Sequence, residues 1–267
     1  MTTQNQADRP RAAVPATAAP RTARATAPAE TTSGGAGGAR FQELMEYLAQ
    51  VPMFADLDLQ SLREVASLMH RRTFQAGEVI FHRGDPGQIM YLIRRGKVKI
   101  SLTSVDGQEV ALALLGRGEY FGELALLDGQ PRSADTIAIE EVEAFWLQRA
   151  DFIRTVTHHP HIAIEVMNVL ARRLRLTDEM VQDLLFLDVH GRVAKKLIEL
   201  TETHGVRTAE GIRIEMRLTQ GELATMVGAS RESVNKVMGY LTERQYVTTD
   251  KHRTTVTRLA ELRRRVC

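Results

Sequence analysis

The sequence predicts an α+β fold in three parts: an antiparallel β-roll, one long helix, and a C-terminal pair of short helices with a two-stranded wing. Three observations predict this fold. Short alternating runs separated by nine glycines lie between residues 73 and 147. A heptad pattern of apolar residues follows, and the last third holds two helical patterns joined by a tight turn. Period-two alternation indicates strands, whereas steps of three and four indicate helix.

At 267 residues the chain suits one or two domains. Its net charge of +2 divides into +3 for residues 1–40, −7 for 41–189 and +6 for 190–267. A basic C-terminal third behind an acidic middle is typical of a nucleic-acid-binding module joined to another domain. An uneven surface without function would give the same division, so charge alone leaves both interpretations open.

The single cysteine, Cys267, excludes disulfides within the chain and clusters held by several cysteines, which fits a cytoplasmic location. No apolar run approaches the roughly 18 residues that a membrane span needs. Residues 1–38 contain mainly Ala, Thr, Pro, Gly and Arg and no aromatic residue, which predicts a disordered tail. Their Arg-rich, acid-poor composition also resembles an organelle transit peptide, but a plain tail is the interpretation we favour.

Residues 39–159 are predicted to form one domain. Helical spacing covers residues 41–69, and the runs "KVKISL" and "EVALALL" then alternate as strands do, with Asp106-Gly107 placed for a hairpin turn. Turn residues about every ten positions favour an antiparallel barrel or sandwich.

Residues 160–188 are predicted to form one long helix with an apolar seam. The seam steps alternately by four and three residues, which is typical of a two-helix coiled coil. A second copy of the chain is the simplest partner, although the helix can also lie on its own domain. Thr177 is a polar residue on this apolar seam. The seam residues are Ala163, Met167, Leu170, Leu174, Thr177, Val181 and Leu184.

Residues 189–267 are predicted to form a nucleic-acid-binding domain. Thr219 with Glu222 forms a capping box, Gly228 ends the first helix, and Ser230 caps the second. One face of the second helix is apolar, and the other carries side chains that can bond to base edges. These side chains are Arg231, Glu232, Asn235 and Lys236. A helical hairpin with a solvated charged face is the alternative.

The segment "YVTTDKHRTTVT" (246–257) predicts a wing whose tip, Lys251 to Arg253, can meet phosphate. The loop "FGELALLDGQPRSAD" (121–135) predicts a binding site for a nucleotide. Arg132 offers a forked donor to phosphate, Ser133 adds a hydroxyl, and Glu123 suits a sugar hydroxyl. A structural Arg–Glu ion pair is the alternative. No acid–base pair or nucleophile constellation is evident, so an enzyme is not expected.

Over about residues 41–260 the chain resembles the bacterial cyclic-AMP receptor protein / fumarate–nitrate regulator family. Five features carry this resemblance: the roll, this loop, the seam "LARRLRLTDEM", the junction "LFLDVHGRVAKKL" and the helix pair "LTQGELATMVGASRESVNKV". The resemblance implies a jelly-roll-like cyclic-nucleotide-binding domain, a dimerisation helix and a winged helix-turn-helix. It implies a homodimeric transcription factor, more often an activator, whose partners are palindromic double-stranded DNA, a second copy and RNA polymerase. No membrane is implied.

The resemblance also implies roles for individual residues. Glu123 would hold the ribose 2′-hydroxyl, Arg132 and Ser133 the cyclic phosphate, and Thr177 the adenine amino group of cyclic AMP. The full ligand set is Gly122, Glu123, Leu124, Arg132, Ser133, Thr177 and Asp178. The DNA set is Thr219, Gln220, Ser230, Arg231, Glu232, Asn235, Lys236, Lys251 and Arg253.

Three departures from the family pattern limit these roles. Asp178 replaces the Ser common in cyclic-AMP receptors and can accept from guanine, which keeps cyclic GMP open. Lys236 replaces a common Arg, so the preferred operator can differ. The N-terminal cysteines of the iron–sulfur branch are absent, and "HHPH" (158–161) lacks further ligands, so no metal is expected.

Further alternatives are a response to cyclic di-GMP, action without any ligand, and a non-transcriptional regulatory subunit. Residues 185–191 are the expected hinge of the switch, because Asp188 can cap a new helix.

Overall fold

The computed structural model describes residues 36–266. The predicted tail therefore lies outside the described residues up to position 35, as does Cys267. Helix α1 (Ala36–Leu48) begins inside the segment assigned to the tail, so residues 36–38 are helical. None of the helices in the part of the chain that the structure describes is long and apolar enough to cross a membrane.

The roll consists of two four-stranded antiparallel sheets, in strand order β1-β8-β3-β6 and β2-β7-β4-β5. The β4–β5 hairpin confirms the predicted turn at Asp106-Gly107, where Gly107 has a φ of 77°. Phe74, Tyr91 and Phe121 fill the space between the sheets. The strands are β1 (His70–Phe74), β2 (Val79–Phe81), β3 (Ile89–Arg95), β4 (Val98–Thr103), β5 (Glu109–Leu115), β6 (Tyr120–Phe121), β7 (Asp135–Ala138) and β8 (Val142–Gln148).

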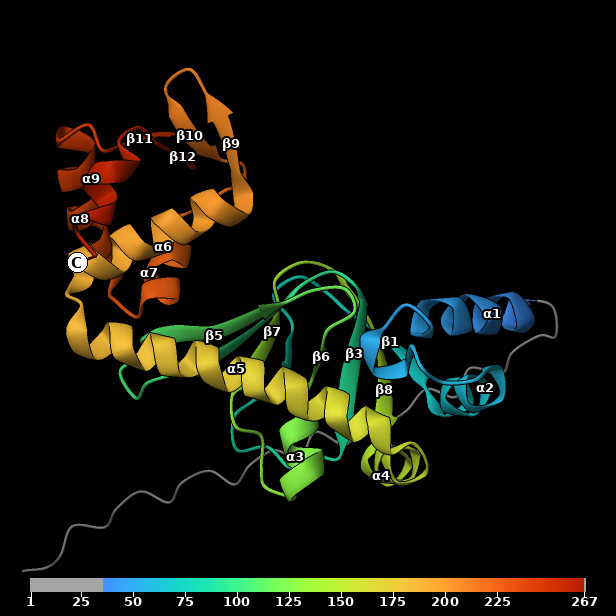
Figure 1. Cartoon of the computed structure of the whole chain (residues 1–267). Helices are drawn as coiled ribbons and strands as arrows, with labels where there is room; N and C mark the ends of the chain where they lie inside the picture. Colours follow the sequence, from blue (N-terminus) through green and yellow to red (C-terminus); the bar gives the residue numbers. More distant parts are fainter. Residues whose placement is uncertain (1–35, 267) are drawn as a thin grey trace, which may run out of the picture.

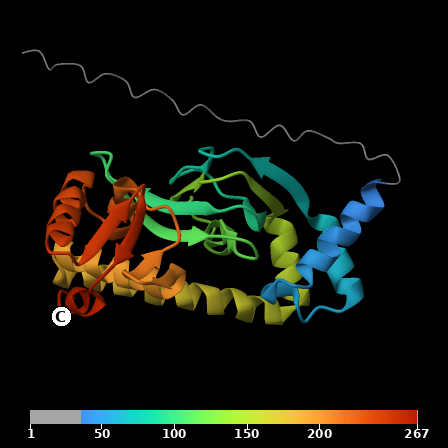
Figure 2. The same cartoon turned by 90° about the horizontal axis from the view of Figure 1, so that it is seen from above.

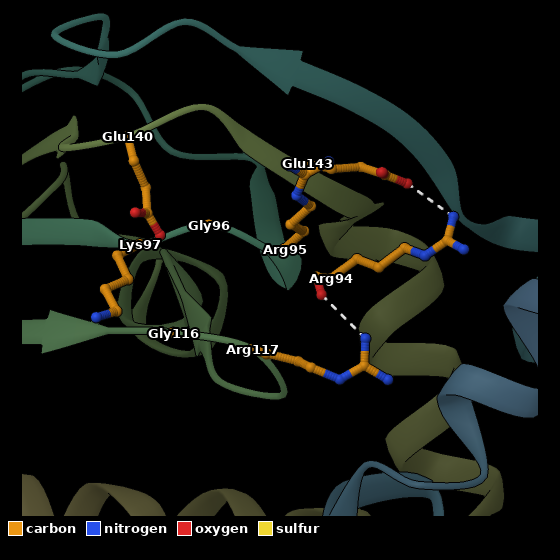
Figure 3. A pocket seen from close by; sticks show the side chains of 8 residues that line it. All are labelled: Arg94, Arg95, Gly96, Lys97, Gly116, Arg117, Glu140 and Glu143. Atoms are coloured by element: carbon orange, nitrogen blue, oxygen red, sulfur yellow. Dashed lines mark hydrogen bonds and ion pairs between the residues drawn. The ribbon is translucent and has the colours of Figure 1, made fainter.

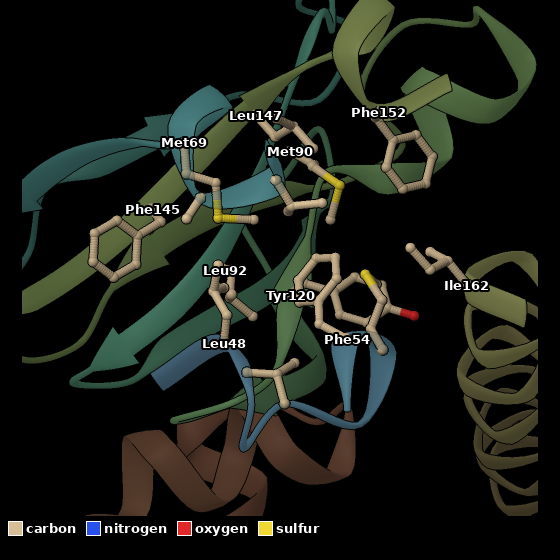
Figure 4. Packing of buried hydrophobic residues seen from close by; sticks show 14 of the residues in the cluster. Leu48, Phe54, Met69, Met90, Leu92, Tyr120, Phe145, Leu147, Phe152 and Ile162 are labelled. Carbon is tan, nitrogen blue, oxygen red and sulfur yellow. The ribbon is translucent and has the colours of Figure 1, made fainter. Parts of the chain in front are cut away.

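Short helices cover one end of the roll and share a core with it. Figure 4 shows Leu48, Phe54 and Ile162 converging on Leu92 and Tyr120 from three directions. The apolar spacing predicted for residues 41–69 supplies much of this core. The helices are α1, η1 (Pro52–Phe54), α2 (Leu59–Leu68), α3 (Glu123–Asp128) and α4 (Arg149–His158).

Helix α5 (Pro160–Phe186) runs along the roll to the C-terminal domain (Figures 1 and 2). Pro160 occupies its first turn, where the missing N–H costs nothing. The helix ends two residues before the predicted boundary at 188, and Asp188 caps the next helix by accepting from Gly191 N at 2.8 Å, as predicted. Most of the predicted seam is exposed in the single chain: Met167 is 58% and Leu174 62% exposed.

The C-terminal domain packs its helices around one apolar core and a four-stranded sheet, in order β11-β12-β10-β9. The wing strands β11 and β12 were predicted, whereas the β9–β10 hairpin and helix α9 were not. The elements are α6 (Val189–His204), β9 (Gly205–Thr208), β10 (Gly211–Ile214), α7 (Gln220–Val227), α8 (Arg231–Glu243), β11 (Val247–Asp250), β12 (Arg253–Val256) and α9 (Leu259–Arg263).

Candidate functional site

The loop 121–135 folds into a cradle built around two glycines. Gly122 caps α3 with a φ of 82°, a conformation that side chains rarely adopt. A Cβ on Gly122 would lie 2.6 Å from Arg132 Nη1. A Cβ on Gly87 would lie 2.4 Å from the Ala125 Cβ and 3.0 Å from Arg132 Cζ. Both glycines therefore leave room for the Arg132 side chain to lie inside the roll.

The Arg132 guanidinium lies in the cradle without a carboxylate partner. The residue is 6% exposed. Its Nη1 donates to the Gly122 carbonyl at 2.8 Å and its Nη2 to the Ile89 carbonyl at 2.7 Å, while Cζ lies 4.2 Å from the Phe81 ring centroid. Among residues 36–266 no carboxylate lies within 4.0 Å of it, and Nε has no hydrogen-bond partner. Burial lowers the pKa of this guanidinium below its usual value.

The Glu123 carboxylate is also buried, at 2% exposed, and is half satisfied. Oε1 accepts from Arg173 Nη1 at 2.8 Å, whereas Oε2 is buried and has no partner within the described part of the chain. Burial raises the pKa of this carboxyl above its usual value, and the nearby Arg173 opposes that shift. Buried polar atoms normally find partners. The free Oε2 can therefore accept from a donor such as a sugar hydroxyl.

Arg173 is a site residue that the sequence analysis missed. It reaches from α5 and also donates to the Tyr120 carbonyl. The Arg–Glu ion pair named above as the alternative therefore exists, but the partner of Glu123 is Arg173 from the long helix and not Arg132. One signal was available: Arg173 lies four residues before Thr177, so the two share a helix face.

The remaining ligand residues are placed differently. Leu124 and Ser133 are exposed at the edge of the cradle. Thr177 and Asp178 are exposed on α5, where Thr177 Oγ1 donates to the Arg173 carbonyl at 3.0 Å. That bond satisfies the hydroxyl on the apolar seam. Through Arg173 the structure joins Thr177 to the cradle, while Ser133 and Asp178 keep their side chains free of hydrogen bonds within residues 36–266.

These residues fit a phosphorylated sugar. A buried guanidinium with no carboxylate calls for an anion, and the free oxygen of Glu123 calls for a hydroxyl donor. The arrangement can bind and orient such a ligand through Arg132 and Glu123.

The predicted helix caps of the C-terminal domain are present. Thr219 Oγ1 accepts from Glu222 N at 3.1 Å, and Glu222 Oε2 accepts from Thr219 N at 2.7 Å, which completes the capping box. Gly228 ends α7 with a φ of 61°. Ser230 Oγ then accepts from Ser233 N at 3.1 Å and caps α8. Gln220 is the first residue of α7, beside these caps.

Helix α8 buries one face and presents the other. Val234, Val237, Met238 and Leu241 are buried, as predicted. Arg231, Glu232, Asn235 and Lys236 are exposed together on the opposite face. No ion pair within residues 36–266 occupies Arg231 or Lys236. An exposed, unpaired set of donors and acceptors on one helix face can meet base edges in a DNA major groove.

The wing turns tightly at its tip. Lys251 and His252 have φ values of 43° and 69°, which gives the β11–β12 hairpin a two-residue turn. The His252 carbonyl accepts from Leu218 N at 2.8 Å, which ties the tip to the start of α7. Lys251 and Arg253 are exposed there. Lys251 and Arg253 at the tip are therefore exposed cations suited to phosphate contacts.

Comparisons with known proteins match both halves of the chain. The model of the cyclic nucleotide-binding domain matches residues 71–159, and that of the Crp-like helix-turn-helix domain matches residues 191–265. The CRP-like cAMP-activated global transcriptional regulator of Mycobacterium tuberculosis is 36% identical over 76% of this chain and 90% of its own length. The cyclic AMP receptor protein of Thermus thermophilus is 38% identical over 72% of this chain and 86% of its own length.

A solved structure, that of the c-di-GMP responsive global regulator CLP of Xanthomonas campestris, has a TM-score of 0.68 with this chain. It covers 74% of this chain and 99% of its own, at 24% sequence identity. At that identity the likeness shows the fold alone.

The raised pKa of Glu123 predicts a pH dependence of stability. A carboxyl whose pKa is higher in the folded state stabilises that state most below its unfolded value near 4.5, and this contribution is lost as the pH rises through the folded value. We expect the free energy of unfolding of the wild type to fall relative to Glu123→Gln as the pH rises above the unfolded value of 4.5. The Arg173 ion pair acts in the opposite direction, because it favours the ionised carboxylate, and the raised pKa already includes this effect.

Urea denaturation of both proteins across this pH range measures the difference. A difference that stays constant, or that moves in favour of the wild type, contradicts the buried environment assigned to Glu123.

Proposed function

The chain belongs to the cyclic-AMP receptor protein / fumarate–nitrate regulator family of cyclic-nucleotide-binding, DNA-binding transcription regulators and is not an enzyme, and from this premise we propose that it is a homodimer activated by cyclic AMP. In this proposal the nucleotide binds in the cradle and changes the affinity of α8 for a palindromic operator. The protein acts as an activator through RNA polymerase, as the family resemblance implies.

The observation that carries the proposal is that the unpaired Arg132 guanidinium and the free oxygen of Glu123 occupy one cradle. Arg132 would exchange its bonds to the Gly122 and Ile89 carbonyls for charge-assisted bonds to the cyclic phosphate, with Ser133 at the cradle edge. The free Glu123 Oε2 would accept from the ribose 2′-hydroxyl. Gly122 and Leu124 line the entrance in this proposal.

Cyclic AMP is supported by the two relatives named for it, which are 36% and 38% identical to this chain. Thr177 would accept from the adenine amino group. Asp178 favours one alternative: its carboxylate can accept two N–H donors of guanine, so cyclic GMP is the second candidate. Cyclic di-GMP, or action without ligand, would keep the same fold with a different occupant of the cradle.

The exposed seam of α5 supports the homodimer. Met167, Leu174, Val181 and Leu184 are all exposed along one helix of the single chain. Apolar side chains in such a row are normally covered, and the heptad spacing suits a second α5. Because Arg173 and Thr177 lie on this same helix, pairing of two α5 helices would place each cradle beside the subunit interface.

A dimer with two-fold symmetry predicts a palindromic operator, with the two α8 helices in successive major grooves about 34 Å apart. Arg231, Glu232, Asn235 and Lys236 would read base edges. Thr219, Gln220, Ser230, Lys251 and Arg253 would contact the DNA backbone.

The hinge between α5 and α6 has contacts that can couple ligand to DNA. Lys195 Nζ donates to both Asp183 carboxylate oxygens, at 2.7 and 2.6 Å, across the bend. Arg192 donates to the Leu187 carbonyl and to the Val227 carbonyl, each at 2.9 Å, and so joins the hinge to the end of α7. A cavity of about 250 Å³ lies between these helices and β5. These contacts join α5 and α6 to α7, so a change in the angle of α5 can be passed on to α7 and α8.

We expect Arg132→Ala to weaken the response to cyclic AMP. Loss of one or two charge-assisted bonds raises the nucleotide concentration for half-maximal operator binding by about 10- to 150-fold. Fluorescence anisotropy with a DNA duplex selected by the wild type measures this value and should saturate at two chains per duplex. Arg154→Ala, which removes an exposed arginine from α4, is the matched control. An unchanged response rejects the phosphate assignment, and saturation at one chain rejects the dimer.

Substitutions on α8 and on the wing should have different effects on DNA binding. Arg231→Ala removes a base-edge donor and should weaken binding to the selected duplex by about 1–3 kcal/mol while relaxing the preference at one base pair. Lys251→Ala removes a phosphate contact and should weaken binding to all duplexes alike. It should also reduce the slope of log affinity against log salt concentration by about 1. Anisotropy titrations against single-base variants at several salt concentrations separate the two. If Arg231→Ala loses the same affinity for every duplex, the Arg231 side chain does not contact base edges.

A further inference from the structure

A second cationic cavity lies at the end of the roll remote from the cradle. Its volume is about 570 Å³, and the turns that join β3 to β4, β5 to β6 and β7 to β8 surround it (Figure 3). Its charged lining residues are Arg94, Arg95, Lys97, Arg117, Glu140 and Glu143. Small-molecule sites in proteins typically have volumes of about 300–1,000 Å³.

Most of the positive charge in this cavity is not neutralised. Glu143 is committed to Arg94 at 2.9 Å and to Arg71 at 3.0 Å. Arg95 and Lys97 have no carboxylate within 4.0 Å among the residues that the structure describes. Arg117 likewise has none there, and only Glu140 remains to oppose the three cations.

The cavity walls are held in place before any ligand arrives. Arg117 donates to the Arg94 carbonyl and to the Gln50 side chain, each at 3.2 Å, and lies over the Tyr47 ring at 4.9 Å. Gly96 has a φ of 87°, and a Cβ there would lie 2.3 Å from the Glu141 carbonyl oxygen. The β3–β4 turn therefore packs directly on the β7–β8 turn. Arg117 is therefore held before an anion binds and loses little entropy, whereas Arg95 and Lys97 are exposed and free of hydrogen bonds within residues 36–266.

This cavity shares no residue with the cradle. Strand β3 connects the two: the Ile89 carbonyl accepts from Arg132 at one end, and Arg94 and Arg95 lie at the other. Six residue steps along a strand span about 20 Å. The cavity also adjoins α1, which Figure 1 places on the side of the roll away from the C-terminal domain and its DNA face.

We propose that this cavity is a second anion site, which binds a small molecule with two or more adjacent negative charges, such as a diphosphate. Three separate cations around one space match a multivalent anion better than a single charge. Guanidinium groups bind phosphoryl oxygens in a forked geometry, and Arg95, whose side chain is free of hydrogen bonds within residues 36–266, provides such a group. Every residue that lines the cavity is charged apart from Gly96 and Gly116, which favours a charged ligand.

The test is a calorimetric titration of the full chain with inorganic pyrophosphate at about 0.15 M salt, where long-range charge effects are screened. We expect saturable binding of one pyrophosphate per chain, and an affinity at least about tenfold lower in Arg95→Ala/Lys97→Ala. Both side chains are exposed and free of hydrogen bonds among residues 36–266, so the variant should keep the melting temperature of the wild type.

Two further variants identify where pyrophosphate binds. Arg63→Ala/Arg154→Ala removes two exposed arginines from α2 and α4 and should leave the affinity unchanged. Arg132→Ala should also leave it unchanged, because Arg132 belongs to the cradle. The proposal is overturned by an absence of saturable binding up to about 5 mM, by equal losses in both double variants, or by loss of binding in Arg132→Ala. The last result would leave the proposed function intact.

Discussion

Arg132 carries its charge into the interior of the roll and meets carbonyl oxygens there instead of a carboxylate. An unpaired buried charge costs several kcal/mol, so the surrounding fold must hold it in place. Gly87 and Gly122 lack side chains because the guanidinium occupies that space. Phe81 supplies a ring face, and the ends of β3 and β6 supply the carbonyls. In our account the whole cradle is built to keep one cation available for an anionic ligand.

The path from the cradle to the DNA face follows α5. Arg173 binds Glu123 in the cradle, and the same helix ends at the hinge, where Asp183 meets Lys195. Beyond the hinge, Arg192 holds the end of α7, next to the start of α8. A ligand that alters the Glu123–Arg173 contact therefore acts on one rigid element of 27 residues. Differential contacts of this kind are what a shift between two conformations requires.

Features fixed by local chemistry were predictable from the sequence. The capping residues Thr219, Ser230 and Asp188 act as predicted, because a cap depends on three or four neighbouring residues. The Arg173–Glu123 contact joins residues 50 positions apart and depends on the path of α5. The β9–β10 hairpin was missed although Ile212, Arg213 and Ile214 alternate as strand residues do, because each strand has only four residues. Strands that short are specified by pairing with β12, which no local pattern reveals.

Isothermal titration of the wild-type chain with cyclic AMP, cyclic GMP and cyclic di-GMP tests the central claim most directly. The account predicts that cyclic AMP binds with one nucleotide per cradle and more tightly than the other two. Tighter binding of cyclic GMP would contradict the choice of cyclic AMP and favour the alternative in which Asp178 accepts from guanine. If none of the three nucleotides gives a saturable heat of binding, the claim that the buried charge of Arg132 is kept for a cyclic phosphate is contradicted.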